Sequence, residues 1–273
     1  MGNYGARNRR WRGGALLVKL NKNSKNAIRI MIVVIIAAMV TCAGVFYVND
    51  YYRASVTAKK AMLGNALVEV EEREGYYLFS AKSSILEEGQ GEGKGIVFYP
   101  GGKVEETAYA PMLLELAEYG FDVYLVKMPA KLAIFGMNAA EAIMQEEGHI
   151  VEWTMMGHSL GGAMAASFSA SHDEAVDKLV LLAAYSTENL KNADIEVYSF
   201  YGSEDRVLDM EKYEEYRENL PEDTVEAVIE GGNHAYYAHY GEQEGDGTAT
   251  ITREEQQESV LDLFLNTQES LRE

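Results

Sequence analysis

The segment 157–161, Gly-His-Ser-Leu-Gly, places one serine between two glycines. An apolar run over 151–156 precedes it and small residues follow over 162–168, so the sequence predicts a strand, a sharp turn and a helix. The glycines would permit a strained turn in which the strand and the helix approach closely. A serine hydroxyl is a weak nucleophile near neutral pH and needs a base beside it. Ser159 is therefore predicted to be a nucleophile at an elbow of this kind.

An acid and a base follow two later apolar runs. Asp205 comes shortly after the run at 195–201, and His234 follows the run at 225–229. If both runs are parallel strands of one sheet, these groups gather at the carboxyl ends of the strands. His234 is then predicted to accept the Ser159 proton and return it to the leaving group. Asp205 is predicted to fix the imidazole tautomer and stabilise the imidazolium.

Other residues compete for the roles of acid and base. Glu204 and Asp209 lie close to Asp205 in sequence and are alternatives for the acid. The chain has four further histidines, of which none directly follows a predicted strand outside the elbow, so His234 is the preferred base. His149 and His172 are expected to be solvated. His158 belongs to the elbow and His239 to the tail.

Two backbone N–H groups are predicted to stabilise a tetrahedral intermediate, which needs preorganised donors. Leu160, next to the nucleophile, would supply one at the start of a helix, where the helix dipole adds to the effect. The loop Tyr-Pro-Gly-Gly-Lys at 99–103, after the first parallel strand, would supply the other. Gly102 is the preferred donor there, and Gly101 and Lys103 are alternatives.

Aromatic and apolar residues beyond two strands are expected to line a substrate cleft. Tyr236 and Tyr237 follow the predicted base directly. Phe135, with Leu132 and Ile134, could form an acyl pocket, although core packing is an equal alternative for this group.

No metal or cofactor is expected. Cys42 is the only cysteine and lies in an apolar segment, so the rest of the chain has neither a disulfide nor a cysteine-based metal site. Glu242, Glu244 and Asp246 have the spacing of a calcium-binding loop. Arg253 stands where such a loop requires glutamate, so a solvated acidic loop is the expectation.

The N-terminus predicts a membrane anchor. Residues 1–29 form a basic leader with eight basic and no acidic residues, and residues 30–48 carry no charge. A helix needs about 20 apolar residues to cross a bilayer. The positive-inside rule then predicts a single-pass cell-membrane protein with a cytoplasmic N-terminus and an extracytoplasmic remainder. A cleaved signal peptide, a lipid-modified Cys42 and a buried core helix are alternatives.

After this anchor we expect a linker or stalk at 49–65 and one globular domain at 66–273. Without the leader, the chain carries a net charge of −27, which disfavours nucleic acid as a partner. Apolar runs alternate with helical segments and predict an α/β fold with a mainly parallel, doubly wound sheet. An antiparallel hairpin is expected before it, over 68–79. The predicted strands are 96–99, 121–126, 151–156, 178–183, 195–201 and 225–229, and the helices are 105–119, 137–147, 162–168, 210–219 and 253–270.

Four motifs give the chain a family resemblance over residues 66–270. It resembles a compact α/β-hydrolase of the branch related to dienelactone hydrolases and small esterases. The resemblance implies the α/β-hydrolase fold, a Ser-His-Asp triad and small-molecule ester substrates. Dienelactone hydrolases use cysteine as nucleophile, and Ser159 moves this chain toward the esterases. The motifs are Tyr-Pro-Gly-Gly-Lys-Val (99–104), Met-Gly-His-Ser-Leu-Gly-Gly (156–162), Tyr-Gly-Ser-Glu-Asp (201–205) and Gly-Gly-Asn-His-Ala (231–235).

Many relatives carry a helical lid between the sixth and seventh strands, whereas residues 185–194 leave little room for one here, so an open site is expected. The leading prediction is a membrane-anchored serine hydrolase that cleaves carboxylic esters through an acyl-enzyme. A peptidase or acyltransferase with the same triad, and an anchored binding domain without catalysis, are the alternatives. The sequence specifies no oligomeric state.

Overall fold

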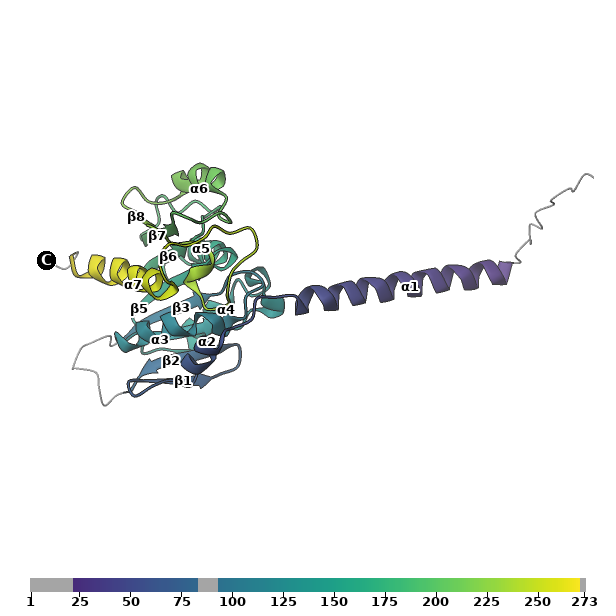
Figure 1. Cartoon of the computed structure of the whole chain (residues 1–273), viewed down its shortest axis with the longest axis horizontal. Helices are drawn as coiled ribbons and strands as arrows, with labels where there is room; N and C mark the ends of the chain where they lie inside the picture. The colour runs from purple at the N-terminus through teal and green to yellow at the C-terminus, as the bar shows by residue number, and fades with distance from the viewer. Residues whose placement is uncertain (1–21, 83–92, 271–273) are drawn as a thin grey trace, which may run out of the picture. The chain divides into compact units, whose positions relative to one another are not determined.

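The computed structural model describes residues 22–82 and 93–270. Internal contacts divide the chain into two compact units, Met1–Asn49 and Asp50–Glu273. The described part of the first unit is one helix, α1 (Lys22–Asn49), and every strand that the structure describes belongs to the second unit (Figure 1).

The strands of the second unit form one sheet within the described residues. Their order is β1-β2-β4-β3-β5-β6-β7-β8. β1 and β2 form an antiparallel hairpin, β2 pairs antiparallel with β4, and every other neighbouring pair is parallel. This arrangement confirms the mainly parallel sheet expected from the sequence. The strands are β1 (Val68–Glu72), β2 (Tyr76–Ala81), β3 (Lys94–Tyr99), β4 (Asp122–Val126), β5 (Glu152–His158), β6 (Lys178–Leu182), β7 (Glu196–Gly202) and β8 (Val225–Ile229).

Helices cover both faces of the sheet, as a doubly wound fold requires (Figure 1). Successive residues of β3 point to opposite faces, so Phe98 joins one hydrophobic core and Val97 the other. Leu113 of α3 and Phe264 of α7 pack in the first core, and Phe168 of α5 packs in the second. The helices of this unit are α2 (Val56–Ala61), α3 (Ala110–Glu118), α4 (Ala139–Glu146), α5 (Leu160–Ser171), α6 (Met210–Tyr216) and α7 (Arg253–Ser270).

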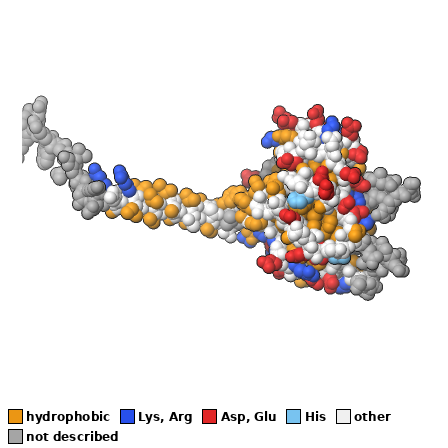
Figure 2. All heavy atoms as spheres, turned by 180° about the vertical axis from the view of Figure 1, so that it is seen from behind, with side chains coloured by type: hydrophobic (Ala, Val, Ile, Leu, Met, Phe, Trp, Pro, Cys, Tyr) orange, Lys and Arg blue, Asp and Glu red, His pale blue; other side chains and the backbone are white. Residues whose placement is uncertain are grey.

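Helix α1 has the length and composition of a membrane span. Its apolar part, Lys25–Tyr47, contains 23 residues with a mean hydropathy of 2.6. At 1.5 Å per residue this part is about 35 Å long, against a hydrocarbon core of about 30 Å. Hydrophobic side chains cover its surface, whereas acidic side chains are spread over the visible face of the second unit (Figure 2).

Residues 50–65 are not a stalk, and that expectation was wrong. The Tyr52 N–H donates to the Lys103 carbonyl at 2.8 Å. Ser55 caps α2 by accepting the Ala58 N–H at 3.2 Å, and Ala58 is fully buried. Small alanine side chains let this segment pack closely, so the globular unit begins at residue 50 rather than 66.

Candidate active site

Ser159 occupies a strained turn between β5 and α5. Its backbone has φ 52° and ψ −124°, a region that residues with a side chain rarely adopt. The turn closes because its glycines lack a Cβ: one on Gly161 would lie 2.1 Å from the Tyr99 carbonyl oxygen, and one on Gly157 would lie 2.6 Å from the Gly161 carbonyl carbon. The Ser159 N–H donates to the Leu182 carbonyl at 2.9 Å, which ties the elbow to β6.

Asp205 and His234 form a buried pair. The Asp205 Oδ2 atom lies 2.8 Å from His234 Nδ1, and the side chains are 1% and 2% exposed, respectively. The other carboxylate oxygen, Oδ1, accepts the N–H groups of Val207 and Leu208, each at 2.8 Å. These amides fix the carboxylate, whose Oδ2 atom can accept a hydrogen bond from a protonated Nδ1. In that tautomer Nε2 is the nitrogen left to exchange a proton elsewhere.

The same edge of the sheet carries all three residues, because Ser159 follows β5, Asp205 follows β7 and His234 follows β8. The rings of His158 and His234 are 4.6 Å apart between centroids, so the elbow and the loop after β8 are in contact. Ser159 is half-buried and thus reachable from solvent. No hydrogen bond joins Ser159 to His234 in the described part of the chain. Such bonds are often long in free enzymes and tighten when substrate binds.

A buried tyrosine that sequence reasoning missed connects the elbow to the loop after β3. The Tyr109 hydroxyl accepts the Gly101 N–H at 2.9 Å and lies 2.8 Å from His158 Nδ1. Burial, and then the neighbouring His234, lower the pKa of His158 well below its usual value. A neutral His158 can accept a hydrogen bond from the Tyr109 hydroxyl at Nδ1. Tyr109 lies in a segment that the sequence showed only as helical.

Gly102 and Leu160 are neighbours at this edge. A Cβ on Gly102 would lie 3.1 Å from the Leu160 Cδ2 atom. The two alternatives to Gly102 have occupied N–H groups, because Gly101 donates to the tyrosine hydroxyl and Lys103 donates to the Lys131 carbonyl at 2.7 Å. Among the described residues, the N–H groups of Gly102 and Leu160 have no acceptor. Both are therefore available to an oxygen bound near Ser159.

The predicted substrate-binding residues differ in their surroundings. Tyr237 is fully buried and its hydroxyl donates to the Phe200 carbonyl at 3.2 Å, so it is not available to a substrate. Tyr236 is half-buried, and its hydroxyl donates to Glu242 at 3.1 Å. Phe135 lies in a short turn, η3 (Ala133–Phe135), and is 64% exposed.

Asp246 is not simply part of a solvated acidic loop. Its Oδ1 atom accepts the Arg206 N–H at 3.2 Å and its Oδ2 atom accepts the Ala235 N–H at 2.9 Å. The first donor is adjacent in sequence to Asp205 and the second is adjacent to His234, so one carboxylate bridges both loops. Over residues 22–82 and 93–270, no cluster of three or more metal-binding side chains is found.

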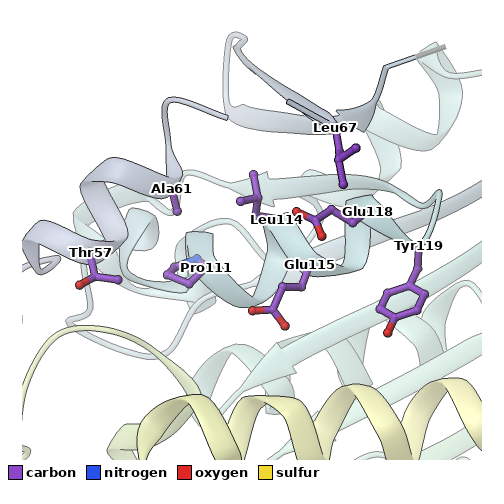
Figure 3. Close-up of a pocket in the computed structure, with 8 residues that line it drawn as sticks. All are labelled: Thr57, Ala61, Leu67, Pro111, Leu114, Glu115, Glu118 and Tyr119. Carbon is purple, nitrogen blue, oxygen red and sulfur yellow. The ribbon is translucent and has the colours of Figure 1, made fainter. Parts of the chain in front are cut away.

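A hollow of about 610 Å³ lies elsewhere, beside α2 and α3 (Figure 3). Burial, followed by the nearby Glu118, raises the pKa of Glu115 in its wall. None of the predicted nucleophile, acid or base residues lines it, so it is not the candidate active site. Its lining residues are Thr57, Ala61, Leu67, Pro111, Leu114, Glu115, Glu118 and Tyr119.

Comparison with known proteins agrees with this fold. The sequence profile of the alpha/beta hydrolase family matches residues 95–258, which is more than half of the chain. The chain belongs to the alpha/beta hydrolase family, as its motifs predicted. The matched range contains Ser159, Asp205 and His234.

Two known proteins resemble parts of this chain. The crystal structure of a predicted CIB-like hydrolase from Thermoplasma acidophilum matches 74% of this chain and 100% of its own, with a TM-score of 0.52 and 20% identity, so the two share a fold. A non-heme haloperoxidase-like protein of Mycobacterium phage D29 is 31% identical over 119 residues, which are 40% of this chain. The match spans 43% of the phage protein, less than half of its length.

Proposed function

We propose that this chain is a serine hydrolase that cleaves carboxylic esters, with Ser159 as nucleophile, His234 as base and Asp205 as the orienting acid. The observation that carries the proposal is the buried contact of 2.8 Å between Asp205 Oδ2 and His234 Nδ1, beside the elbow that presents Ser159. This arrangement satisfies the requirement that the base be held in one tautomer behind the nucleophile.

The proposed reaction has two halves. His234 Nε2 takes the Ser159 hydroxyl proton as Oγ attacks the ester carbonyl, and the N–H groups of Gly102 and Leu160 stabilise the oxyanion. The intermediate then collapses, the His234 proton passes to the leaving alkoxide, and an alcohol departs from an acyl-enzyme. Water repeats the sequence with His234 again as base, which releases the acid and regenerates the serine.

The proposed site has no helical lid between the sixth and seventh strands. The segment between β6 and β7 contains no helix, and all of its residues are described. A peptidase or an acyltransferase would use the same groups, and a non-catalytic binding domain would use none of them. Assays with p-nitrophenyl esters, matched amides and added alcohol acceptors distinguish an ester hydrolase from a peptidase and from an acyltransferase. A fluorophosphonate probe separates all of them from a binding domain.

Ser159→Ala tests the assignment of the nucleophile. We expect it to abolish fluorophosphonate labelling and to lower ester turnover by about 10³-fold or more, because members of such a triad act as a unit. Ser171→Ala is the matched control, since Ser171 lies exposed at the far end of the same helix. Near-normal turnover by the purified Ser159→Ala protein would overturn the proposal.

We also propose that α1 anchors the protein in the cell membrane, with the basic leader in the cytoplasm and the hydrolase unit outside. The length of its apolar part and the eight basic residues before it support this orientation. Protease added to intact spheroplasts should then digest the hydrolase unit. Protection until lysis would indicate the opposite orientation, and release of a soluble mature form from untreated cells would favour a cleaved signal peptide.

A further inference from the structure

The chain is fixed to the loop that carries Gly102 almost as soon as α1 ends. Asp50 is the residue after α1, and its carboxylate pairs with Lys103 Nζ at 2.6 Å. Tyr52 then donates its N–H to the Lys103 carbonyl. One residue spans at most about 3.6 Å, so whatever the direction of α1, Tyr52 lies within about 11 Å of the last residue of the helix. The connection between α1 and this loop is therefore short.

A second loop, over 129–135, is joined to the same place. The Lys131 carbonyl accepts the Lys103 N–H, and Lys131 Nζ lies 5.6 Å from the centroid of the Tyr51 ring. Lys131 also pairs with the buried Glu106. Lys103 and Lys131 have φ values of 58° and 57°, which non-glycine residues rarely adopt, so these contacts impose the shape of both loops.

This second loop presents apolar side chains beside the candidate site. Leu132 lies next to Gly102, with its Cδ2 atom 3.7 Å from the position of a Cβ there. Ile134 and Phe135 follow and are 58% and 64% exposed. Exposed apolar side chains at the rim of a site are able to contact a lipid surface or the apolar part of a ligand.

We propose that the substrate is a membrane-resident amphiphile, an ester whose acyl chain remains in the outer leaflet while its carbonyl reaches Ser159. This inference rests on the proposed ester hydrolysis and on α1 as an anchor. The short connection limits how far the rim of the site can move from the end of the anchor, and Ile134 and Phe135 contact the acyl chain. Because the rest of the unit is acidic, anionic headgroups repel it, and electrostatic attraction does not supply this contact.

The test compares two esters with the full-length protein reconstituted in phosphatidylcholine vesicles. p-Nitrophenyl palmitate partitions into the bilayer, and p-nitrophenyl acetate stays in water. We expect the wild type to favour the palmitate. Inserting twelve Gly/Ser residues between Asn49 and Asp50 should lower palmitate hydrolysis several-fold, because the effective concentration at the surface falls as the tether lengthens. The same insertion should leave acetate hydrolysis unchanged.

Substitution of the apolar rim provides the second arm. Ile134→Ser combined with Phe135→Ser should lower the palmitate-to-acetate ratio of kcat/KM by about 10-fold, the factor expected when large apolar side chains lose partial burial. Val151→Ser is the matched control, because Val151 is 81% exposed and precedes β5 at the opposite end of the strand from Ser159.

The outcomes separate the two proposals. The membrane-resident substrate alone is overturned if the wild type hydrolyses the acetate without preferring the palmitate. It is also overturned if neither the insertion nor the rim substitutions change the palmitate-to-acetate ratio of kcat/KM. Failure of the wild type to hydrolyse either ester or to react with the fluorophosphonate overturns the ester hydrolase, and the substrate class with it.

Discussion

Asp246→Asn tests how far the candidate site depends on a residue that takes no part in the chemistry. Both oxygens of Asp246 accept backbone N–H groups, one beside Asp205 and one beside His234. An asparagine has one acceptor oxygen and would turn its NH₂ group toward another donor. One of the two loops must therefore lose its partner, while the shape of the side chain is kept.

The size of the effect follows from these contacts. A hydrogen bond to a charged group contributes about 1.5–3 kcal/mol, and the half-buried position of Asp246 favours the lower part of that range. We expect the free energy of unfolding to fall by about 1–2 kcal/mol. A displacement of about 1 Å between reacting groups can cost a factor of about 100, so kcat should fall about 10- to 100-fold. KM should change little, because Asp246 is not expected to touch the substrate.

The assay is p-nitrophenyl acetate hydrolysis, with a urea denaturation curve for each protein. Glu244→Gln serves as the control, since Glu244 lies exposed in the same loop and contacts the Tyr52 hydroxyl through its backbone N–H. Asp246→Ala should be at least as impaired as Asp246→Asn. If folded Asp246→Asn retained the kcat of the wild type, the carboxylate bridge would have no role in positioning the base and the acid.

Three further outcomes are expected. His234→Ala should lose nearly all ester hydrolysis, whereas His172→Ala should match the wild type; equal losses in the same assay would mean that the base is misassigned. A truncated protein beginning at Asp50 should be soluble and active, and one beginning at Ala66 should give a lower melting temperature, because it uncovers surface that residues 50–65 bury. His158 has a pKa well below about 6.5 when folded and near that value when unfolded, so the unfolded state binds more protons and stability falls as pH drops below 6.5, by at most about 1.4 kcal/mol per pH unit. Urea midpoints at pH 7 and pH 5 check this, and a midpoint that rises in acid would contradict it.

The fold could be predicted because its elements are strongly patterned. The strands at the centre of the sheet are continuous apolar runs, as burial on both faces demands. In sequence α3 lies between two of them and α7 follows the last strand, and each helix buries apolar side chains in the same core. The position of Ser159 was equally readable, since a strand, two glycines and small residues constrain the backbone in one way. Whether that serine acts as a nucleophile stays a prediction.

Other parts of the fold and of the site could not be predicted from the sequence, for physical reasons. The segment at 50–65 is polar in composition, yet it packs through Ala54 and Ala58, whose small side chains give only a weak hydrophobic signal. Tyr237 follows the predicted base as Tyr236 does, but the turn that follows β8 directs Tyr237 into the core. The roles of Asp246 and Tyr109 depend on backbone N–H groups from distant segments, and no pattern of side chains records those partners.

β8 lies at the edge of the sheet and pairs only with β7. Most of its residues are half-buried or exposed, and Ile229 alone is buried. Local opening concentrates where few apolar contacts hold a segment, so β8 should detach at a lower free energy than the strands around β3. The loop that carries His234 would leave with it, while Ser159 stayed on an intact β5. Heating would then abolish the activity while most of the sheet was still formed. Cooling would restore the activity without refolding of the central strands.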